Sequence, residues 1–191
     1  MDDVLKIALC GKMRSGKDSV GSLLTTRYDF YPKIAFGDTL KEIAHKTFPH
    51  IPREPKPRAL YQHMNGHRAF YENVWVDPVA RKVGYALDMR STKGVVITDV
   101  RQQNEFDWCR NNGFTIVRVT ASDDVRIARA ERNGDVFNYE DLTHPTELEI
   151  DTFDVDYELS NDGAYPDLVA EVERLVAEVK RRLLPTPSNK S

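Results

Sequence analysis

Residues 4–19 read VLKIALCGKMRSGKDS, an apolar run followed by two glycines, a lysine and an acidic residue. The run Val4–Cys10 ends at a glycine and predicts a short buried strand. Gly11 and Gly16 permit a loop whose backbone N–H groups surround phosphate oxygens, and Lys17 adds a positive charge at the start of the next helix. The stretch therefore predicts a phosphate-binding loop between a strand and a helix.

Asp18 departs from the usual form of such a loop, in which serine or threonine follows the lysine and binds Mg²⁺. A carboxylate is also a suitable oxygen ligand for Mg²⁺ or for one of its water molecules, so Asp18 indicates a variant of the site. Ser19, one position later, is a second candidate ligand. The alternative is a glycine- and lysine-rich turn without a ligand, which the flanking strand and helix disfavour.

The composition is that of an ordinary globular chain. Its 191 residues suit one domain; 40% of them are hydrophobic, 30% are charged, and the formal net charge is −3. This charge gives no overall reason to bind a nucleic-acid polymer or an anionic membrane. Cys10 and Cys109 lack metal-ligand spacing and favour a reducing compartment. Without a predicted signal peptide or membrane span, we expect a soluble cytoplasmic protein.

Predicted strands and helices alternate along the chain. After the first strand we expect strands at 33–36, 94–100, 114–119 and 155–159. Helices are expected at 18–27, 39–48, 103–112, 123–133 and 167–184. This alternation predicts an α/β fold with three layers, a parallel five-stranded sheet covered by helices on both faces.

The domain organisation follows from the lengths of the connections. A single domain is expected to span 1–184, with a flexible tail at 185–191. The stretch 39–93 is too long for a simple crossover between parallel strands, so it is a candidate inserted region. A polar stretch after the arginine-rich helix extends to residue 146.

Asp99 and Arg101 follow the Val/Ile run of the third predicted strand. Open α/β sheets place ligands at the carboxyl ends of their strands, beside the phosphate loop. There Asp99 would hold Mg²⁺ through water or orient the attacking phosphate, and Arg101 would bind an acceptor phosphate. The alternative is that Asp99 caps the next helix and Arg101 forms a surface ion pair with Glu105.

Three arginines, Arg126, Arg129 and Arg132, recur at helical spacing. Phosphoryl transfer accumulates negative charge on the equatorial oxygens, and arginines that close over it are a common means of stabilisation. Arg129 and Arg132 are the preferred candidates. The alternative is a solvated helix face.

Several motifs together resemble the deoxynucleoside monophosphate kinases of tailed bacteriophages. GKMRSGKDS at 11–19 is similar to their usual phosphate loop, GxxRSGKD-[ST]; animal phosphomevalonate kinases also have the aspartate. FGDTLKEIA at 36–44 resembles the family segment F-[AG]-D-x-L-K. Residues 96–119 resemble its strand-D-x-R-x-x-x-E segment, and HPTE at 144–147, with the later ELSND, resembles its H-x-[ST]-E and final-strand signature. These segments cover most of the chain in order.

The resemblance implies a P-loop kinase fold and ATP-dependent, Mg²⁺-dependent phosphorylation of deoxynucleoside 5′-monophosphates, in the host cytoplasm if the chain is phage-encoded. It implies that 39–93 is an acceptor-binding insertion and that 123–147 is an arginine-rich lid over ATP. ATP and the dNMP would be the small-molecule partners; a homodimer stays open. Alternatives are a related kinase of phosphomevalonate or dephospho-coenzyme A, and a nucleotide-binding regulator without transferase activity.

The insertion also resembles the family pattern R-x-x-L-Q-x-x-G-x-x-x-R-x-x-x-x-x-x-W. Arg58, Gln62, Arg68 and Trp75 match it, but MNGH replaces the simpler glycine turn, so the accepted bases stay open. Arginines bind phosphate bidentately and an aromatic face stacks on a base. The alternative is a small aromatic core with surface arginines.

The candidate site residues fall into four groups. Catalytic roles are expected for Lys17, Arg101, Arg129 and Arg132. ATP contacts are expected for Gly11, Met13, Arg14, Ser15, Gly16, Lys17, Asp18 and Ser19. Acceptor contacts are expected for Phe36, Asp38, Lys41, Arg58, Gln62, Arg68, Trp75, Asp99, Arg101, His144 and Glu147. Metal contacts are expected for Asp18, Ser19 and Asp99.

Overall fold

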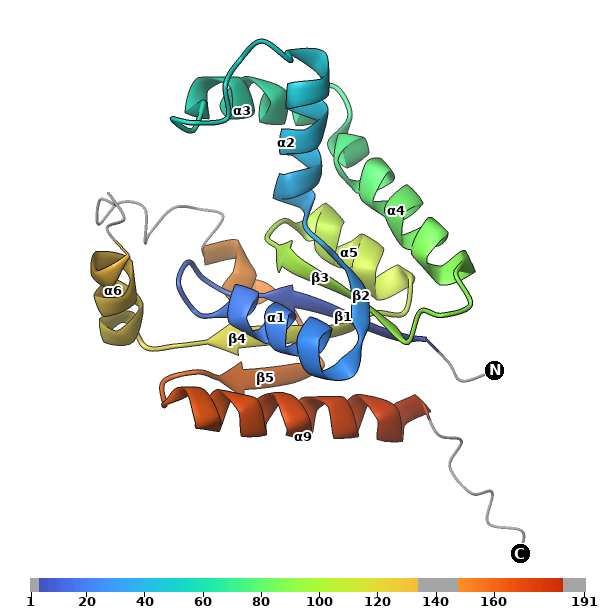
Figure 1. The fold of residues 1–191 in the computed structure, drawn as a ribbon, viewed down its shortest axis with the longest axis vertical. Helices are drawn as coiled ribbons and strands as arrows, with labels where there is room; N and C mark the ends of the chain where they lie inside the picture. Colours follow the sequence, from blue (N-terminus) through green and yellow to red (C-terminus); the bar gives the residue numbers. More distant parts are fainter. Residues whose placement is uncertain (1–3, 134–147, 184–191) are drawn as a thin grey trace, which may run out of the picture.

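Five parallel strands form the centre of the molecule, in the order β2-β3-β1-β4-β5 (Figure 1). The strands are β1 (Leu5–Cys10), β2 (Phe30–Ile34), β3 (Gly94–Val100), β4 (Thr115–Thr120) and β5 (Tyr157–Ser160). The computed structural model describes residues 4–133 and 148–183. His144, Glu147, most of the expected lid and the C-terminal tail therefore lie outside the described residues.

The central strand is β1, which pairs with β3 on one side and β4 on the other. Ile7 pairs with Val96 of β3 and with Thr115 of β4. After β3 the chain crosses over β1, so the direction of strand addition reverses at this strand. Such a switch point leaves a crevice at the carboxyl ends of the strands. The predicted phosphate loop begins at this crevice.

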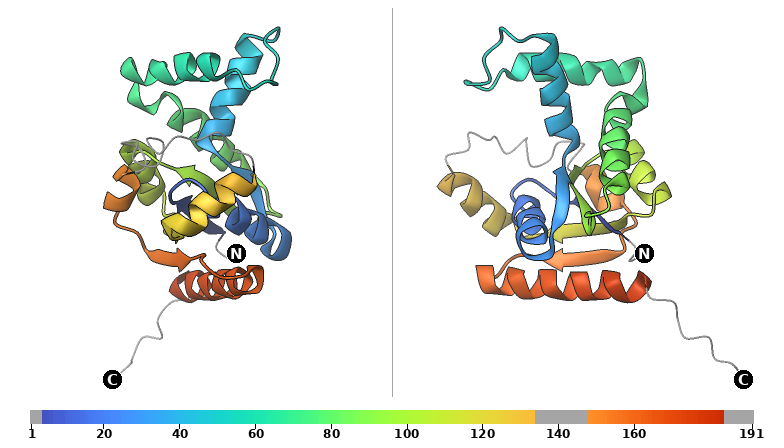
Figure 2. Two further views of the ribbon diagram at one scale, coloured as in Figure 1. Left: turned by 90° about the vertical axis from the view of Figure 1, so that its left-hand side faces the viewer. Right: turned by 45° about the vertical axis from the view of Figure 1, so that its right-hand side comes forward.

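Helices cover both faces of the sheet (Figure 2). They are α1 (Lys17–Tyr28), α2 (Phe36–Thr47), α3 (Arg58–Asn65), α4 (Val76–Asp88), α5 (Gln103–Asn111), α6 (Asp123–Arg132) and α9 (Tyr165–Leu183). Short 3₁₀ helices are η1 (Gly66–Ala69), η2 (Glu72–Val74) and η3 (Ile150–Thr152).

Two apolar cores lie on the two faces of the sheet. On one face, Leu24 of α1 and Leu175 of α9 pack against alternate residues of the strands such as Ile7. On the other face, Val79 of α4 and Phe106 of α5 pack with the remaining strand residues. The expected parallel five-stranded sheet with helices on both faces is confirmed. Within 4–133 and 148–183, no helix combines the length and the apolarity that a membrane crossing requires.

The segment between β2 and β3 projects beyond the sheet as α2, α3, η1 and η2, and α4 returns along the sheet (Figure 1). A third, small core holds the projecting part together, with Leu40 and Ala44 of α2 against Met64 and Trp75. The helix predicted from residue 39 begins at Phe36. The helix starts earlier because the carboxylate of Asp99, near the end of β3, accepts hydrogen bonds from the backbone N–H groups of Phe36 and Gly37.

Candidate active site

The loop between β1 and α1 has the backbone conformation of a phosphate-binding loop. Gly11 and Gly16 have φ angles of +146° and +104°, and Gly16 is the N-cap of α1. A Cβ atom at Gly16 would lie 2.0 Å from Nδ2 of Asn161. At Gly11 it would lie 2.3 Å from the carbonyl oxygen of Val119. Both positions therefore require glycine, for conformation and for space.

Lys17 is the first residue of α1, directly after this loop, and is only 7% exposed. Its Nζ donates hydrogen bonds to the carbonyl oxygens of Gly11 (2.7 Å) and Lys12 (3.0 Å). These bonds hold the ammonium group against the loop that precedes α1, and the N–H groups and dipole at the start of that helix also favour an anion. The loop can bind the phosphates of a nucleotide.

Side chains from distant elements hold the loop from outside. Asn161, after β5, donates from Nδ2 to the carbonyl oxygen of Ser15 at 2.8 Å. Arg126 of α6, 3% exposed, donates from Nε to the carbonyl oxygen of Met13 at 2.8 Å. These bonds give partners to two carbonyl groups of the loop, that of Ser15 being buried.

A polar cleft of about 820 Å³ opens over the loop. Six of the side chains that line it are basic: Arg14, Lys17, Lys56, Arg58, Arg101 and Arg129. Two are acidic, Asp18 and Asp99. Such an excess of positive charge favours anionic ligands, and the volume suits a ligand of nucleotide size.

Asp18, Ser19 and Asp99 all line this cleft and offer oxygen atoms to a hard cation. Among residues 4–133 and 148–183 there is no group of three or more His, Cys, Asp or Glu side chains arranged around a metal position. Mg²⁺ keeps several water molecules and takes one or two carboxylates together with substrate phosphates. The donor set therefore fits Mg²⁺ bound jointly with a phosphate ligand.

Asp99 also has a structural role. Its Oδ1 accepts a hydrogen bond from the backbone N–H of Phe36 (2.7 Å) and its Oδ2 from that of Gly37 (2.8 Å). Burial raises the pKa of this carboxyl group, while the two N–H donors and Arg101 act in the opposite direction. Asp99 therefore caps α2. The alternative that it caps the next helix, α5, is wrong, because Gln102 and Glu105 cap that helix. The side chain of Asp99 still lines the cleft.

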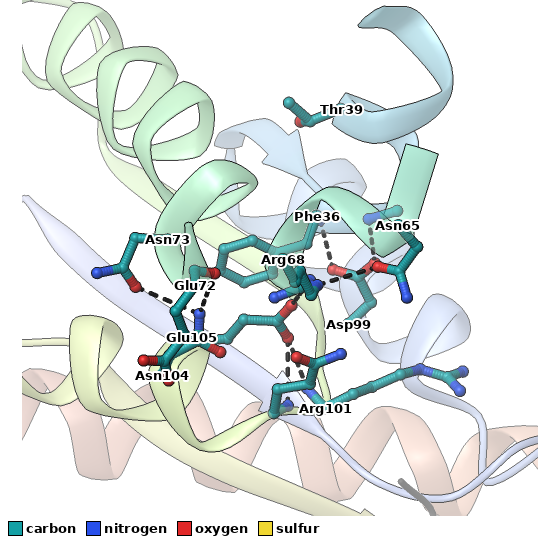
Figure 3. Close-up of polar contacts among 12 residues, drawn as sticks. Phe36, Thr39, Asn65, Arg68, Glu72, Asn73, Asp99, Arg101, Asn104 and Glu105 are labelled. Atoms are coloured by element: carbon teal, nitrogen blue, oxygen red, sulfur yellow. Dashed lines mark hydrogen bonds and ion pairs between the residues drawn. The ribbon is translucent and has the colours of Figure 1, made fainter. Parts of the chain in front are cut away.

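The ion pair of Glu105 is formed with Arg68, not with Arg101 (Figure 3). The Arg68 Nη2 atom lies 2.6 Å from Glu105 Oε1. The backbone N–H of Arg101 donates to Glu105 Oε2 at 2.9 Å, whereas the side chain of Arg101 lines the cleft. The structure therefore places Arg101 in the cleft and Arg68 outside its lining.

The remaining acceptor candidates are divided between the cleft and other surroundings. Arg58 lines the cleft. Trp75 is 2% exposed and packs in the small core of the insertion, so no ring face is presented to a ligand. The side chain of Phe36 is likewise buried, and Gln62 is exposed on α3.

Asp38 and Lys41 lie away from the cleft, within α2. They form an ion pair with each other at 2.6 Å, three residues apart on one helix. Asp38 lines a separate hollow of about 370 Å³ beside the edge strand β2. In this structure neither side chain is part of the lining of the cleft over the phosphate loop.

The three arginines of α6 differ in surroundings. Arg126 is buried and pairs with Asp123 at 2.6 Å. Arg129 lines the cleft and donates to the carbonyl oxygen of Asn161 at 2.8 Å. Arg132 is exposed and does not belong to the lining. Steps of three residues fall short of a full 3.6-residue turn, so the three side chains rotate around the helix and do not share one environment.

Sequence reasoning missed seven residues of the cleft lining, of which Asn161 and Lys56 contribute polar side chains to the site. Asn161 carried a signal, because it lies in the ELSND segment and before a glycine turn. Lys56 carried none beyond its charge, because the proline-rich stretch around it predicts only irregular backbone. The other unpredicted lining residues are Thr98, Asn133, Gly163, Tyr165 and Leu168.

Solved structures share this architecture. The chain matches TT1252 from Thermus thermophilus with a TM-score of 0.59 and 20% identity, over 92% of this chain and 97% of that one. It matches a gluconokinase from Sinorhizobium meliloti 1021 with a TM-score of 0.53 and 22% identity, over 94% and 98%. A shikimate kinase from Acinetobacter baumannii, in complex with shikimate, gives a TM-score of 0.57 and 15% identity, over 96% and 97%.

Sequence comparison identifies the family. The family described as AAA domain matches residues 7–141, which include the phosphate loop, the insertion and β3. No curated protein sequence matches the chain. The gluconokinase and the shikimate kinase have the same fold as this chain. The chain therefore belongs to the AAA-domain family and shares the fold of these two kinase structures.

Proposed function

We propose that the protein transfers the γ-phosphoryl group of ATP to a deoxynucleoside 5′-monophosphate. The donor half of the cleft is the loop Gly11–Ser19, with Lys17 inside it and Arg129 beside it. A glycine-rich loop followed by a helix N-terminus suits the phosphates of a nucleoside triphosphate. This part of the proposal rests on the geometry of the loop.

The acceptor half carries the argument for a phosphorylated acceptor. Lys56 and Arg58, from the loop before α3 and from its first residue, line the same cleft as the phosphate loop. Arg101, after β3, joins them from the sheet. Together with the basic residues of the loop, these three cations provide more positive charge than one triphosphate requires, so a second phosphate group can bind here. Arginine is well suited to bidentate binding of such a group.

The proposed reaction needs no strong base. An anionic oxygen of the acceptor phosphate attacks the γ-phosphorus of ATP, the new O–P bond forms, and the bond to the β-phosphate oxygen breaks to release ADP. Lys17, Arg101 and Arg129 neutralise the charge that is shared between donor and acceptor phosphates. Asp18, Ser19 and Asp99 would hold Mg²⁺, which neutralises charge on the phosphates when bound.

The identity of the base-bearing acceptor rests on the resemblance to phage kinases. The aromatic side chains of the insertion give no further support, because Trp75 is buried and neither Phe70 nor Tyr71 lines the cleft. A second candidate is therefore a kinase of another phosphorylated acceptor, such as phosphomevalonate or dephospho-coenzyme A. Lys56, Arg58 and Arg101 would bind the phosphate group of such an acceptor as readily as that of a dNMP.

A coupled assay of ADP release decides between these candidates. ATP and MgCl₂ are supplied with each of the four common dNMPs, the corresponding ribonucleotides, phosphomevalonate, dephospho-coenzyme A, shikimate and gluconate. We expect turnover with at least one dNMP well above the ATPase activity without acceptor. Turnover only with a non-nucleotide acceptor would replace the proposed substrate, and ATP binding without turnover on any acceptor would favour a regulator.

A further inference from the structure

Glu105 connects two parts of the acceptor half of the cleft that are far apart in the sequence. It lies in the first turn of α5, and its side chain is 3% exposed. Oε2 accepts hydrogen bonds from the backbone N–H groups of Arg101 (2.9 Å) and Gln102 (3.3 Å). Oε1 accepts the hydrogen bond of Arg68, from η1 in the insertion. One carboxylate thus holds the turn after β3 and the insertion together (Figure 3).

The partner of this carboxylate is itself held in place. Arg68 donates from Nε to Oδ1 of Asn65, the last residue of α3, at 3.0 Å. The helix that ends at Asn65 begins at Arg58, which lines the cleft. The path from Arg58 through α3 and Arg68 to Glu105 ends on the backbone of Arg101, which also lines the cleft.

A second connection lies beside the first. Asn104, the neighbour of Glu105, donates from Nδ2 to the carbonyl oxygen of Glu72 (2.9 Å) and to Oδ1 of Asn73 (3.2 Å), both in η2. These bonds dock α5 on the insertion but touch neither Arg58 nor Arg101. Glu105 differs because one of its oxygens binds the Arg101 backbone and the other binds Arg68, which is hydrogen-bonded to the end of the helix that begins at Arg58.

We infer that Glu105 is a positioning residue, and that its bonds to Arg68 and to the Arg101 backbone fix the spacing of Arg58 and Arg101 to fit an acceptor phosphate. The inference rests on the proposed function. A buried ion pair is weak support for a purely stabilising role, because desolvation offsets much of its attraction. The arrangement is better explained by the geometry that it imposes, and it assigns Arg68 to positioning, away from direct acceptor contact.

The test separates positioning from stability by three variants. Arg68→Met leaves a buried carboxylate without its partner and should lower thermal stability strongly. Glu105→Gln keeps an acceptor for the Arg101 N–H but loses the charge. The double variant Glu105→Gln/Arg68→Met removes both charges and should recover most of the stability, while the spacing of the cations stays unfixed.

Kinetics with a dNMP acceptor give the main readout. We expect KM for the acceptor to rise about tenfold in Glu105→Gln and in the double variant, as for loss of one charge-assisted bond, with KM for ATP unchanged within about twofold. Glu42→Gln is the matched control, because Glu42 forms an exposed ion pair with Lys82 at 2.7 Å. It should leave both constants unchanged. An acceptor KM that recovers with stability in the double variant, or equal rises in both constants, would overturn the inference.

A readout without acceptor keeps the inference testable if no dNMP is a substrate. Wild-type protein that shows no dNMP-dependent turnover contradicts the proposed function alone. Hydrogen exchange of the ATP-bound protein then tests the connection itself. Glu105→Gln should speed exchange both in Gly66–Ala69 and at Arg101–Gln102, whereas faster exchange on only one side would show that the two are not coupled through Glu105.

Discussion

On the proposed donor side of the cleft, the phosphate loop is held by buried side chains from α6 and from directly after β5, whereas on the proposed acceptor side Lys56 and Arg58 are exposed. Lys17 makes two backbone contacts inside the loop. No hydrogen bond or ion pair of the Lys56 side chain occurs within the part of the chain that the structure describes. We therefore expect substitutions in the firmly held loop to abolish ATP binding, and substitutions of single exposed cations on the other side to weaken acceptor binding by degrees.

The largest effect is expected for Gly16→Ala on the donor side. The added methyl group would lie 2.0 Å from Asn161 Nδ2, at a residue with φ of +104°. ATP binding, measured by calorimetry, should be lost because the loop cannot keep its conformation.

Gly84→Ala is the matched control for this substitution. Gly84 lies within α4, and a Cβ atom there would meet nothing within 4 Å. We expect it to bind ATP normally and to be stabilised by about 0.5–1 kcal/mol, because alanine is the better helix former. Normal ATP affinity in Gly16→Ala would show that the loop is less constrained than the structure indicates.

The next largest effect is expected on turnover in Lys17→Met, a substitution that removes the charge and keeps much of the side-chain volume. Turnover should fall by about 10²–10³-fold, the usual cost of losing one preorganised stabilising group in the transition state. The exposed Lys46 of α2 provides the control Lys46→Met, which should leave turnover unchanged. Near-normal turnover in Lys17→Met would refute the donor site.

A graded effect is expected on the acceptor side. Arg58→Ala should raise KM for the acceptor about tenfold, the value of one hydrogen bond to a charged group, and leave KM for ATP unchanged. Arg53→Ala is the control, because Arg53 lies in the same exposed stretch but not in the lining of the cleft. Equal effects of the two substitutions would mean that the stretch contributes only general positive charge.

The smallest expected signal comes from the two buried cysteines, Cys10 at the end of β1 and Cys109 in α5. Burial raises the pKa of Cys10 to about 11 and also raises the pKa of Cys109. At pH 8 both thiols should therefore be protonated as well as inaccessible, and a thiol reagent should label them only after unfolding. Labelling of Cys10 in folded protein would show that the base of the donor side opens, against the proposed rigidity.

Sequence reasoning predicted the parts of the molecule that depend on local pattern. The Val/Ile run of β3 and the alternation of strands and helices led to the correct sheet. The glycine and lysine spacing located the loop, because each residue there acts within a short stretch of backbone.

The misplaced residues depend on contacts between distant parts of the chain. Arg68 could not be separated from a ligand-binding arginine until Glu105, 37 residues away, was seen to accept its hydrogen bond. Trp75 matched a motif, but its burial follows from the packing of α2 and α3 around it. Charge and aromatic character predict interaction sites, and only the fold decides whether the partner is a ligand or the protein itself.

The most direct test of the central proposal is product identification with [γ-³²P]ATP. ATP, MgCl₂ and a dNMP are incubated with wild-type protein and with Lys17→Met, and the nucleotides are separated by chromatography. We expect the label to appear in the deoxynucleoside diphosphate with wild-type protein, and about 10²–10³-fold more slowly with the variant. Label that appears only in inorganic phosphate, or stays in ATP with every dNMP, would contradict the account.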